Sequence, residues 1–190
     1  MSSSFANCKI ARRIGVRKRL NRLSRLQKYM TSDIYTILDD LGISYEKHEH
    51  EAVFTVEEAN KHYAVISGAH TKNLFLKNKT ASQFYLFSIA SHKRADLKAL
   101  AKTLGESKLH FGNERELMEY LGLTPGSVSL LGLANDREGR VKVLIDRELW
   151  EAERINSHPN TNTATLTLSQ VDFRRFLEWS GHGVKVVNCP

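Results

Sequence analysis

Two apolar runs separated by a short polar turn constrain the fold of this chain more than any other feature. Residues 73–77 read NLFLK and residues 83–90 read QFYLFSIA, with the polar stretch 78–82 between them. Short apolar runs bounded by turn residues are typical of buried strands. A connection of this length joins neighbouring antiparallel strands, because a parallel crossover needs a dozen or more residues. The sequence therefore predicts an antiparallel pair of strands here.

The segments around this pair alternate between helical and strand periodicity. We expect helices at 32–41, 56–62, 94–104, 113–121 and 169–179, and a turn or short helix at 146–151. We expect further strands at 43–48, 108–111, 141–145, 163–168 and 184–187. Several neighbouring strands have only hairpin-length links, so the sheet should be mixed and the fold class α+β.

Length and composition place the chain among ordinary globular proteins. Its 190 residues fit one domain, and 41% are hydrophobic and 26% charged. No apolar run approaches the roughly 18 residues of a membrane span, so we expect no membrane partner. Cys8 and Cys189 lie near opposite ends, without a second cysteine beside either. This usage favours a reducing compartment, and we expect the protein to be cytoplasmic.

The net charge of +7 is concentrated at the N-terminus. Residues 1–32 hold nine of the 28 Lys/Arg residues and no Asp or Glu, which leaves 19 Lys/Arg against all 21 acids in the remainder. The basic balance therefore belongs to an N-terminal extension, residues 1–30, and not to the domain expected at 31–190.

The extension has the pattern of a basic amphipathic helix. Its apolar residues recur at steps of three and four: Val16, Leu20, Leu23, Leu26 and Met30. Three interpretations remain open. The segment is a mitochondrial transit peptide, which would change the localisation; a phosphate-binding arm; or translated sequence upstream of a true start at Met30.

Polar residues beside the expected strands are candidates for a site. Lys72 offers a point charge suited to phosphate, and the Asn73 carboxamide can donate and accept hydrogen bonds. The segment 158–165, HPNTNTAT, is rich in hydrogen-bonding groups, and the loop 126–129, GSVS, has little side-chain bulk. The alternatives are a solvated strand end for Lys72 and ordinary turn chemistry for the loops.

A metal site is not expected. His48 and His50 are two residues apart and would share a face of a strand, but no Cys-x-x-Cys or other full ligand set accompanies them.

Six motifs in order resemble the prolyl-tRNA editing family, the YbaK/ProX-type deacylases. They are HEAVFTV at 50–56, KNLFL at 72–76, RADLK at 94–98, GSV at 126–128, HP at 158–159 with NTAT at 162–165, and GH at 181–182. The resemblance covers about residues 31–187. It implies a compact α+β domain around a mixed, barrel-like sheet. It also implies hydrolysis of the ester between a wrong amino acid and tRNA, without a cofactor.

The subgroup that this sequence most resembles, the ProX or PrdX type, removes alanine from tRNA for proline. The partner implied is therefore the acceptor end of mischarged tRNA(Pro). By resemblance, Lys72 steadies the 3′-terminal nucleotide, Gly126 and Ser127 lie on the loop that encloses the aminoacyl group, and His158 lines the same pocket. The further substrate-binding residues implied are His50, Thr55, Asn73 and Asn162.

One residue departs from the family pattern. The family usually has proline where Leu130 stands, which puts the shape of the loop and the amino-acid selectivity in question. It also makes an inactive tRNA- or synthetase-binding module an alternative. The sequence offers no nucleophile in a Gly-x-Ser-x-Gly elbow, so we expect attack by water, with backbone amides of the loop at 126–129 holding the oxyanion. His158 is either a general base or a structural residue.

Overall fold

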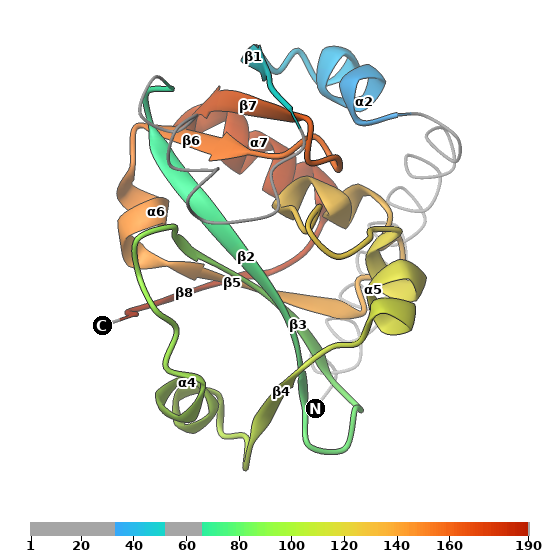
Figure 1. Cartoon of the computed structure of the whole chain (residues 1–190), viewed down its shortest axis with the longest axis vertical. Helices are drawn as coiled ribbons and strands as arrows, with labels where there is room; N and C mark the ends of the chain where they lie inside the picture. Colours follow the sequence, from blue (N-terminus) through green and yellow to red (C-terminus); the bar gives the residue numbers. More distant parts are fainter. Residues whose placement is uncertain (1–32, 52–65, 190) are drawn as a thin grey trace, which may run out of the picture. The chain divides into compact units, whose positions relative to one another are not determined.

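The computed structural model describes residues 33–51 and 66–189 (Figure 1). Thr55, the helix expected at 56–62 and the basic extension lie outside the described residues. The helices are α2 (Ile34–Asp40), α4 (Leu97–Leu104), α5 (Glu114–Leu121), the 3-10 helix η1 (Leu130–Ala134), α6 (Arg147–Glu151) and α7 (Gln170–Ser180). The strands are β1 (Tyr45–Glu49), β2 (Ala69–Asn78), β3 (Phe84–Ala90), β4 (Leu109–Phe111), β5 (Val141–Asp146), β6 (Arg154–Ser157), β7 (Ala164–Ser169) and β8 (Val184–Val187).

The strands form one mixed sheet in the order β1-β7-β6-β2-β3-β5-β8, with β4 paired to β2. The predicted hairpin is confirmed, since β2 and β3 are antiparallel with Phe75 opposite Leu86. Parallel ladders join β3 to β5, β5 to β8, and β2 to β6. The α+β class with a mixed sheet and flanking helices is therefore confirmed.

Strand β2 is the element around which the sheet is organised. Its first residues pair with β6, residues 71–77 pair with β3, and its last residues pair with β4. It is ten residues long and starts earlier than the sequence indicated. Lys72, expected at the mouth of a short strand, is therefore the fourth residue of a long one, and that expectation was wrong.

Successive side chains of β2 point to opposite faces of the sheet. Leu76 lies on one face in an apolar cluster with residues of β3, β5 and α4, among them Phe87, Leu100 and Leu144. Phe75 lies on the other face, stacked on Phe84 with ring centroids 5.5 Å apart. The two faces carry different chemistry, as the sites below show.

Local sequence signals set several helix ends. Asn113 and Glu116 form a capping box at the start of α5, and Asp96 accepts hydrogen bonds from two amides at the start of α4. Two expectations need correction. The helix expected at 94–104 begins only at Leu97, and the sequence did not predict β6. Within the described residues, no helix has the length and apolar character needed to cross a membrane.

Candidate active site

The pleat of β2 separates the two neighbouring site candidates Lys72 and Asn73. The Asn73 carboxamide donates to the carbonyl of Val128 at 3.1 Å, on the loop before η1. The Lys72 ammonium instead donates to the carbonyls of Ser91 and Lys93, beyond the end of β3. Adjacent strand residues point to opposite faces, so Lys72 reaches a different part of the molecule from Asn73.

The charge of Lys72 is uncompensated. Its partners in the described part of the chain are neutral carbonyl oxygens, and no carboxylate lies within ion-pair distance. By contrast, Lys77 pairs with Glu116 at 2.7 Å, and Lys93 pairs with Asp146 at 2.8 Å. Lys72 thus keeps a positive charge that an anionic group can meet.

The loop at 126–129 is held in place by its neighbours. Gly126 has a φ of +87°, which disfavours a side chain, and a β-carbon there would lie 3.9 Å from Nδ2 of the Asn162 side chain. The Ser127 amide donates to the carbonyl of Thr124 at 3.1 Å, so it is committed to a turn. The amides of Gly126 and Val128 donate to no acceptor among residues 33–51 and 66–189. The buried amide of Ser129 likewise has no acceptor there, so three of the loop's four amides are uncommitted in the described residues.

Ser129 joins this loop to the histidine segment. Its hydroxyl donates to the carbonyl of His158 at 2.6 Å and accepts from the amide of Leu131, which caps η1. Leu130, in the position where the resemblance implies proline, is fully buried as the first residue of η1. The loop is fixed by this cap, although the ring of a proline is missing.

His158 has one nitrogen engaged and one open. Its Nδ1 lies 2.9 Å from the carbonyl of Ala164, so Nδ1 carries the proton and Nε2 has the lone pair. No described residue bonds Nε2. Burial lowers the pKa of His158, the bond to Ala164 opposes that shift, and neighbouring His50 lowers the pKa further. The imidazole is therefore neutral near pH 7.

His50 stands beside His158, with ring centroids 6.2 Å apart. Its Nδ1 lies 2.8 Å from the carbonyl of Glu51 and its Nε2 lies 3.0 Å from the hydroxyl of Thr165. The structure thus brings His50, Asn73, the loop at 126–129, His158 and Asn162 to one region. Lys72 does not join them directly, and Thr55 lies outside the described residues.

A narrow polar crevice, too tight to hold a free water molecule, lies next to His158. Its lining residues are His70, Thr71, Asn156, Ser157, His158 and Thr165. Asn156 is 2% exposed, accepts from Thr167 at 2.6 Å and donates to the carbonyl of Ser67. The buried hydroxyl of Ser157 has no hydrogen-bond partner in the described structure. A buried polar group without a partner is uncommon and marks a place for a ligand group or water.

Sequence reasoning did not assign Asn156 and Ser157 to the site. They lie in β6, a strand with the sequence RINS that lacks an apolar alternation. The signal that was available is the spacing of Thr165 and Thr167, which puts both hydroxyls on one face of β7 toward a neighbouring strand.

Metal ligands do not cluster in the described residues: no three His, Cys, Asp or Glu side chains lie together there.

A family model described as the aminoacyl-tRNA editing domain matches residues 50–176.

The chain belongs to the aminoacyl-tRNA editing domain family. Its curated relatives in this family match over most of their length. The prolyl-tRNA editing protein ProX of Acetoanaerobium sticklandii is 37% identical over 150 residues, which cover 79% of this chain and 92% of the relative. The prolyl-tRNA synthetase associated domain-containing protein 1 of Xenopus laevis is 36% identical over 163 residues, which cover 84% and 96%.

Solved structures share the fold of this editing domain. The hypothetical protein APE2540 superposes with a TM-score of 0.62 at 20% identity, over 80% of this chain and 95% of that one. A second crystal structure, described as a candidate trans-editing enzyme for prolyl tRNA synthetase, has a TM-score of 0.61 at 18% identity, over 85% and 99%. The resemblance in the sequence motifs therefore identified the right family.

Proposed function

We propose that the protein is a trans-acting aminoacyl-tRNA deacylase that hydrolyses mischarged tRNA(Pro), with alanyl-tRNA(Pro) as its substrate. Membership of the editing family supports ester hydrolysis on tRNA. The name of the ProX relative supports tRNA for proline. One observation in the structure carries the proposal: the open Nε2 of His158 lies in the same region as a loop with uncommitted amides, among them those of Gly126 and Val128.

These groups supply what water attack on an ester needs. Neutral His158 accepts a proton from water through Nε2 as the water attacks the ester carbon. The amides of Gly126 and Val128 donate to the oxyanion that develops, an effect worth about 3 kcal/mol per donor where it has been tested. The ester oxygen then leaves with the ribose and takes up a proton. Ser127 supports the turn and not the oxyanion, because its amide is bonded to Thr124.

The polar groups around His158 favour a small aminoacyl group. The crevice is too tight to hold a free water molecule, so it leaves no room for a long side chain. The hydroxyl of Ser157 can accept a hydrogen bond from the substrate ammonium, and the buried Oδ1 of Asn73 likewise has no partner in the described structure. Asn162 and His50 border the same region. Lys72 lies on the other face of β2, so its charge would meet a tRNA phosphate away from the ester.

Deacylation assays with differently charged tRNA test the proposal. tRNA(Pro) charged with labelled alanine, serine, cysteine or proline is incubated with the protein, and release of the amino acid is followed. We expect fastest release of alanine and none of proline beyond the buffer rate. If every ester survives while the tRNA still binds, the chain is a binding module and the proposed activity is wrong.

A further inference from the structure

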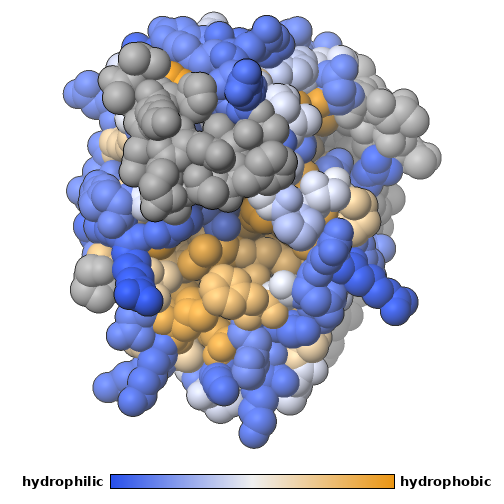
Figure 2. All heavy atoms as spheres, viewed as in Figure 1, coloured by the Kyte–Doolittle hydropathy of each residue, from blue (hydrophilic) through white to orange (hydrophobic). Residues whose placement is uncertain are grey.

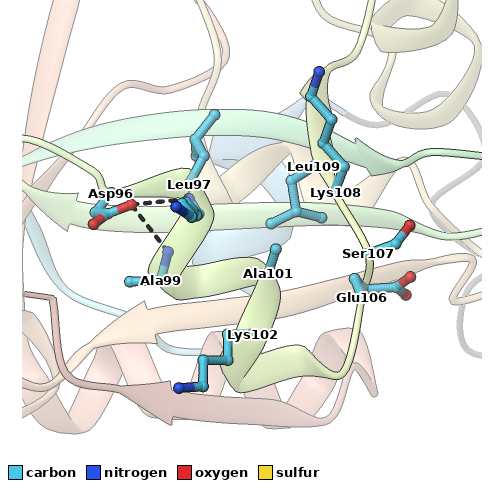
Figure 3. Close-up of a pocket in the computed structure, with 10 residues that line it drawn as sticks. Asp96, Leu97, Ala99, Ala101, Lys102, Glu106, Ser107, Lys108 and Leu109 are labelled. Atoms are coloured by element: carbon cyan, nitrogen blue, oxygen red, sulfur yellow. Dashed lines mark hydrogen bonds between the residues drawn. The ribbon is translucent and has the colours of Figure 1, made fainter.

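A groove lies away from the candidate active site, between α4 and β4 (Figure 3). Its volume is about 750 Å³. Leu97 and Ala101 of α4 and Leu109 of β4 supply apolar side chains to it. Ala101 and Leu109 also belong to the apolar cluster around Leu76. The groove therefore opens on the face of β2 opposite to Asn73.

An exposed aromatic side chain extends this apolar surface. Phe111 is 61% exposed, the most exposed of the large hydrophobic side chains after Val171. It pairs with Leu76 in the ladder between β2 and β4, and paired residues share a face. Figure 2 shows an apolar patch ringed by hydrophilic residues in the region of β2, α4 and β4. Exposed apolar patches with a polar rim mark interaction sites.

Lysines form the rim of the groove. Lys98, Lys102 and Lys108 line it and are exposed, and none pairs with an acid among the described residues. Figure 3 shows Lys102 and Lys108 extending in different directions from the α4 and β4 sides. This rim presents an unbalanced positive charge to solvent.

The two acidic residues of the groove offset part of that charge, because a carboxylate keeps its charge when it accepts hydrogen bonds from neutral donors, and the lining as a whole carries a net charge of one positive. Asp96 accepts from the amides of Lys98 and Ala99 at the start of α4. Glu106 accepts from the hydroxyl of Tyr85 and the carboxamide of Asn78.

We propose that this groove is a docking site for an acidic amphipathic helix of a protein partner. Such a helix places an apolar stripe into a groove and charged residues along its rims. Leu97, Leu109 and Phe111 would receive the stripe, and the three lysines would face carboxylates. Charge complementarity of this kind sets partner choice and the rate of association.

Charge and chemistry disfavour the other occupants. Residues 1–32 of this chain carry nine Lys/Arg and no acid, so a lysine rim repels them. A second copy would bring the same lysines against each other across a two-fold axis. RNA supplies phosphates for the rim but no aliphatic surface for Leu97 and Leu109, and it would stack on a single aromatic side chain, Phe111, whereas sites for single strands stack successive bases. The inference goes beyond the proposed deacylase, since Asn73 and the loop at 126–129 lie on the face of β2 opposite to the groove, while Lys72 shares the face of the groove.

A synthetic helix tests this proposal directly. The probe is a fluorescein-labelled peptide of ~20 residues with leucines at i, i+4 and i+7 and glutamates on the flanks, and the control peptide has lysines for the glutamates. Fluorescence anisotropy with the full chain should show saturable binding of the acidic peptide that weakens with salt. Lys102→Glu and Phe111→Ala should each weaken it about tenfold or more.

Arg115→Glu is the matched charge control. Arg115 is exposed on α5, on the other side of β2, and should leave the affinity unchanged. Equal binding of both peptides, no saturable binding, or equal losses in Lys102→Glu and Arg115→Glu would overturn the proposal. It also fails if uncharged tRNA displaces the peptide, or if sedimentation shows a dimer that Phe111→Ala dissociates. Deacylation by these variants is measured in parallel, so failure of the groove is distinguishable from failure of the active site.

Discussion

His158 and His182 both sit in polar clusters, but the two clusters are completed differently. Both nitrogens of His182 have partners: the hydroxyl of Ser180 at 3.1 Å and the carboxylate of Asp136 at 3.0 Å. His158 has a partner on Nδ1 and, in the described residues, none on Nε2. The first cluster is satisfied by the fold itself, whereas the second leaves hydrogen-bonding capacity for a ligand.

This difference shows why residue types alone do not identify a catalytic group. Ser180, His182 and Asp136 have the composition of a hydrolase triad, yet all three are buried and the serine hydroxyl donates to the carbonyl of Leu177. Saturated buried networks stabilise a fold. Open hydrogen-bonding groups beside a crevice cost stability unless function retains them.

The largest effect is expected from His158→Ala. Loss of a general base lowers the rate about 10²-fold to 10⁴-fold. Because the ring is only half-buried, its removal should change the melting temperature little. Deacylation of alanyl-tRNA(Pro) and the melting temperature would be measured together, with exposed His92→Ala as the control. Wild-type turnover by the His158 variant would assign that ring to structure only.

The pH profile of the wild-type protein checks the same assignment. The base must be neutral, and the pKa of His158 is lowered by burial. The rate should therefore hold as pH falls to about 6.5, the value for an ordinary histidine, and decline only below it. A decline centred above pH 6.5 contradicts this role for His158.

The second prediction concerns the closed cluster. Burial alone would raise the pKa of Asp136, but hydrogen bonds from His182 and from the amides of Val141 and Arg140 outweigh it and lower that pKa. Asp136→Ala leaves these buried donors unpaired and should cost about 3 kcal/mol of unfolding free energy, seen in urea melts. Deacylation per folded molecule should not change.

Asp136 also makes the free energy of unfolding depend on pH in the acid range. A carboxyl with a lowered folded pKa stabilises the protein fully above its unfolded pKa of about 3.9, and this contribution is lost as pH falls through the folded pKa. Wild-type stability should fall below about pH 4. An acid transition with the same slope in Asp136→Ala would show that other groups control it.

Short-range signals in the sequence predicted more of the fold than of the site. The two residues of the capping box, Asn113 and Glu116, are three positions apart, and a short turn joins β2 to β3, so both features can be recognised from the local sequence. The crevice depends on β6 pairing with β2 and β7, which no local pattern of RINS indicates. Polar Asn156 is stable in that buried strand because Thr167 donates to it from the next strand.

Lys72→Ala tests whether a side chain on the face of β2 opposite to Asn73 takes part in the reaction. If its uncompensated charge meets the tRNA phosphate, kcat/KM falls about tenfold to a hundredfold, equivalent to roughly 1.5–3 kcal/mol. The melting temperature should drop slightly, because two hydrogen bonds to carbonyls are lost. A large loss of stability with unchanged kcat/KM in the folded fraction would place Lys72 with the structural residues.

Lys77→Ala is the comparison variant on the same strand. Its ammonium is paired with Glu116, and both side chains are largely buried. Its removal should lower stability by about 1–2 kcal/mol and leave kcat/KM unchanged. Lys72→Ala would then lower mainly kcat/KM, and Lys77→Ala would lower mainly the stability. If Lys77→Ala lowers kcat/KM as much as Lys72→Ala does, the position of the positive charge along β2 does not matter for the reaction.

The smallest effect is expected from removing residues 1–29. This truncation tests whether folding or deacylation needs the basic extension. The charge pattern of the extension stops before α2, which begins at Ile34, so the shortened protein should keep its melting temperature and its kcat/KM for alanyl-tRNA(Pro) within about twofold. The comparison should be run at low and at physiological salt. Nine Lys/Arg residues would bind RNA backbone through counterion release, and a steep loss of affinity confined to low salt would identify a phosphate-binding arm. Collapse of the melting transition would instead show that the extension is part of the fold.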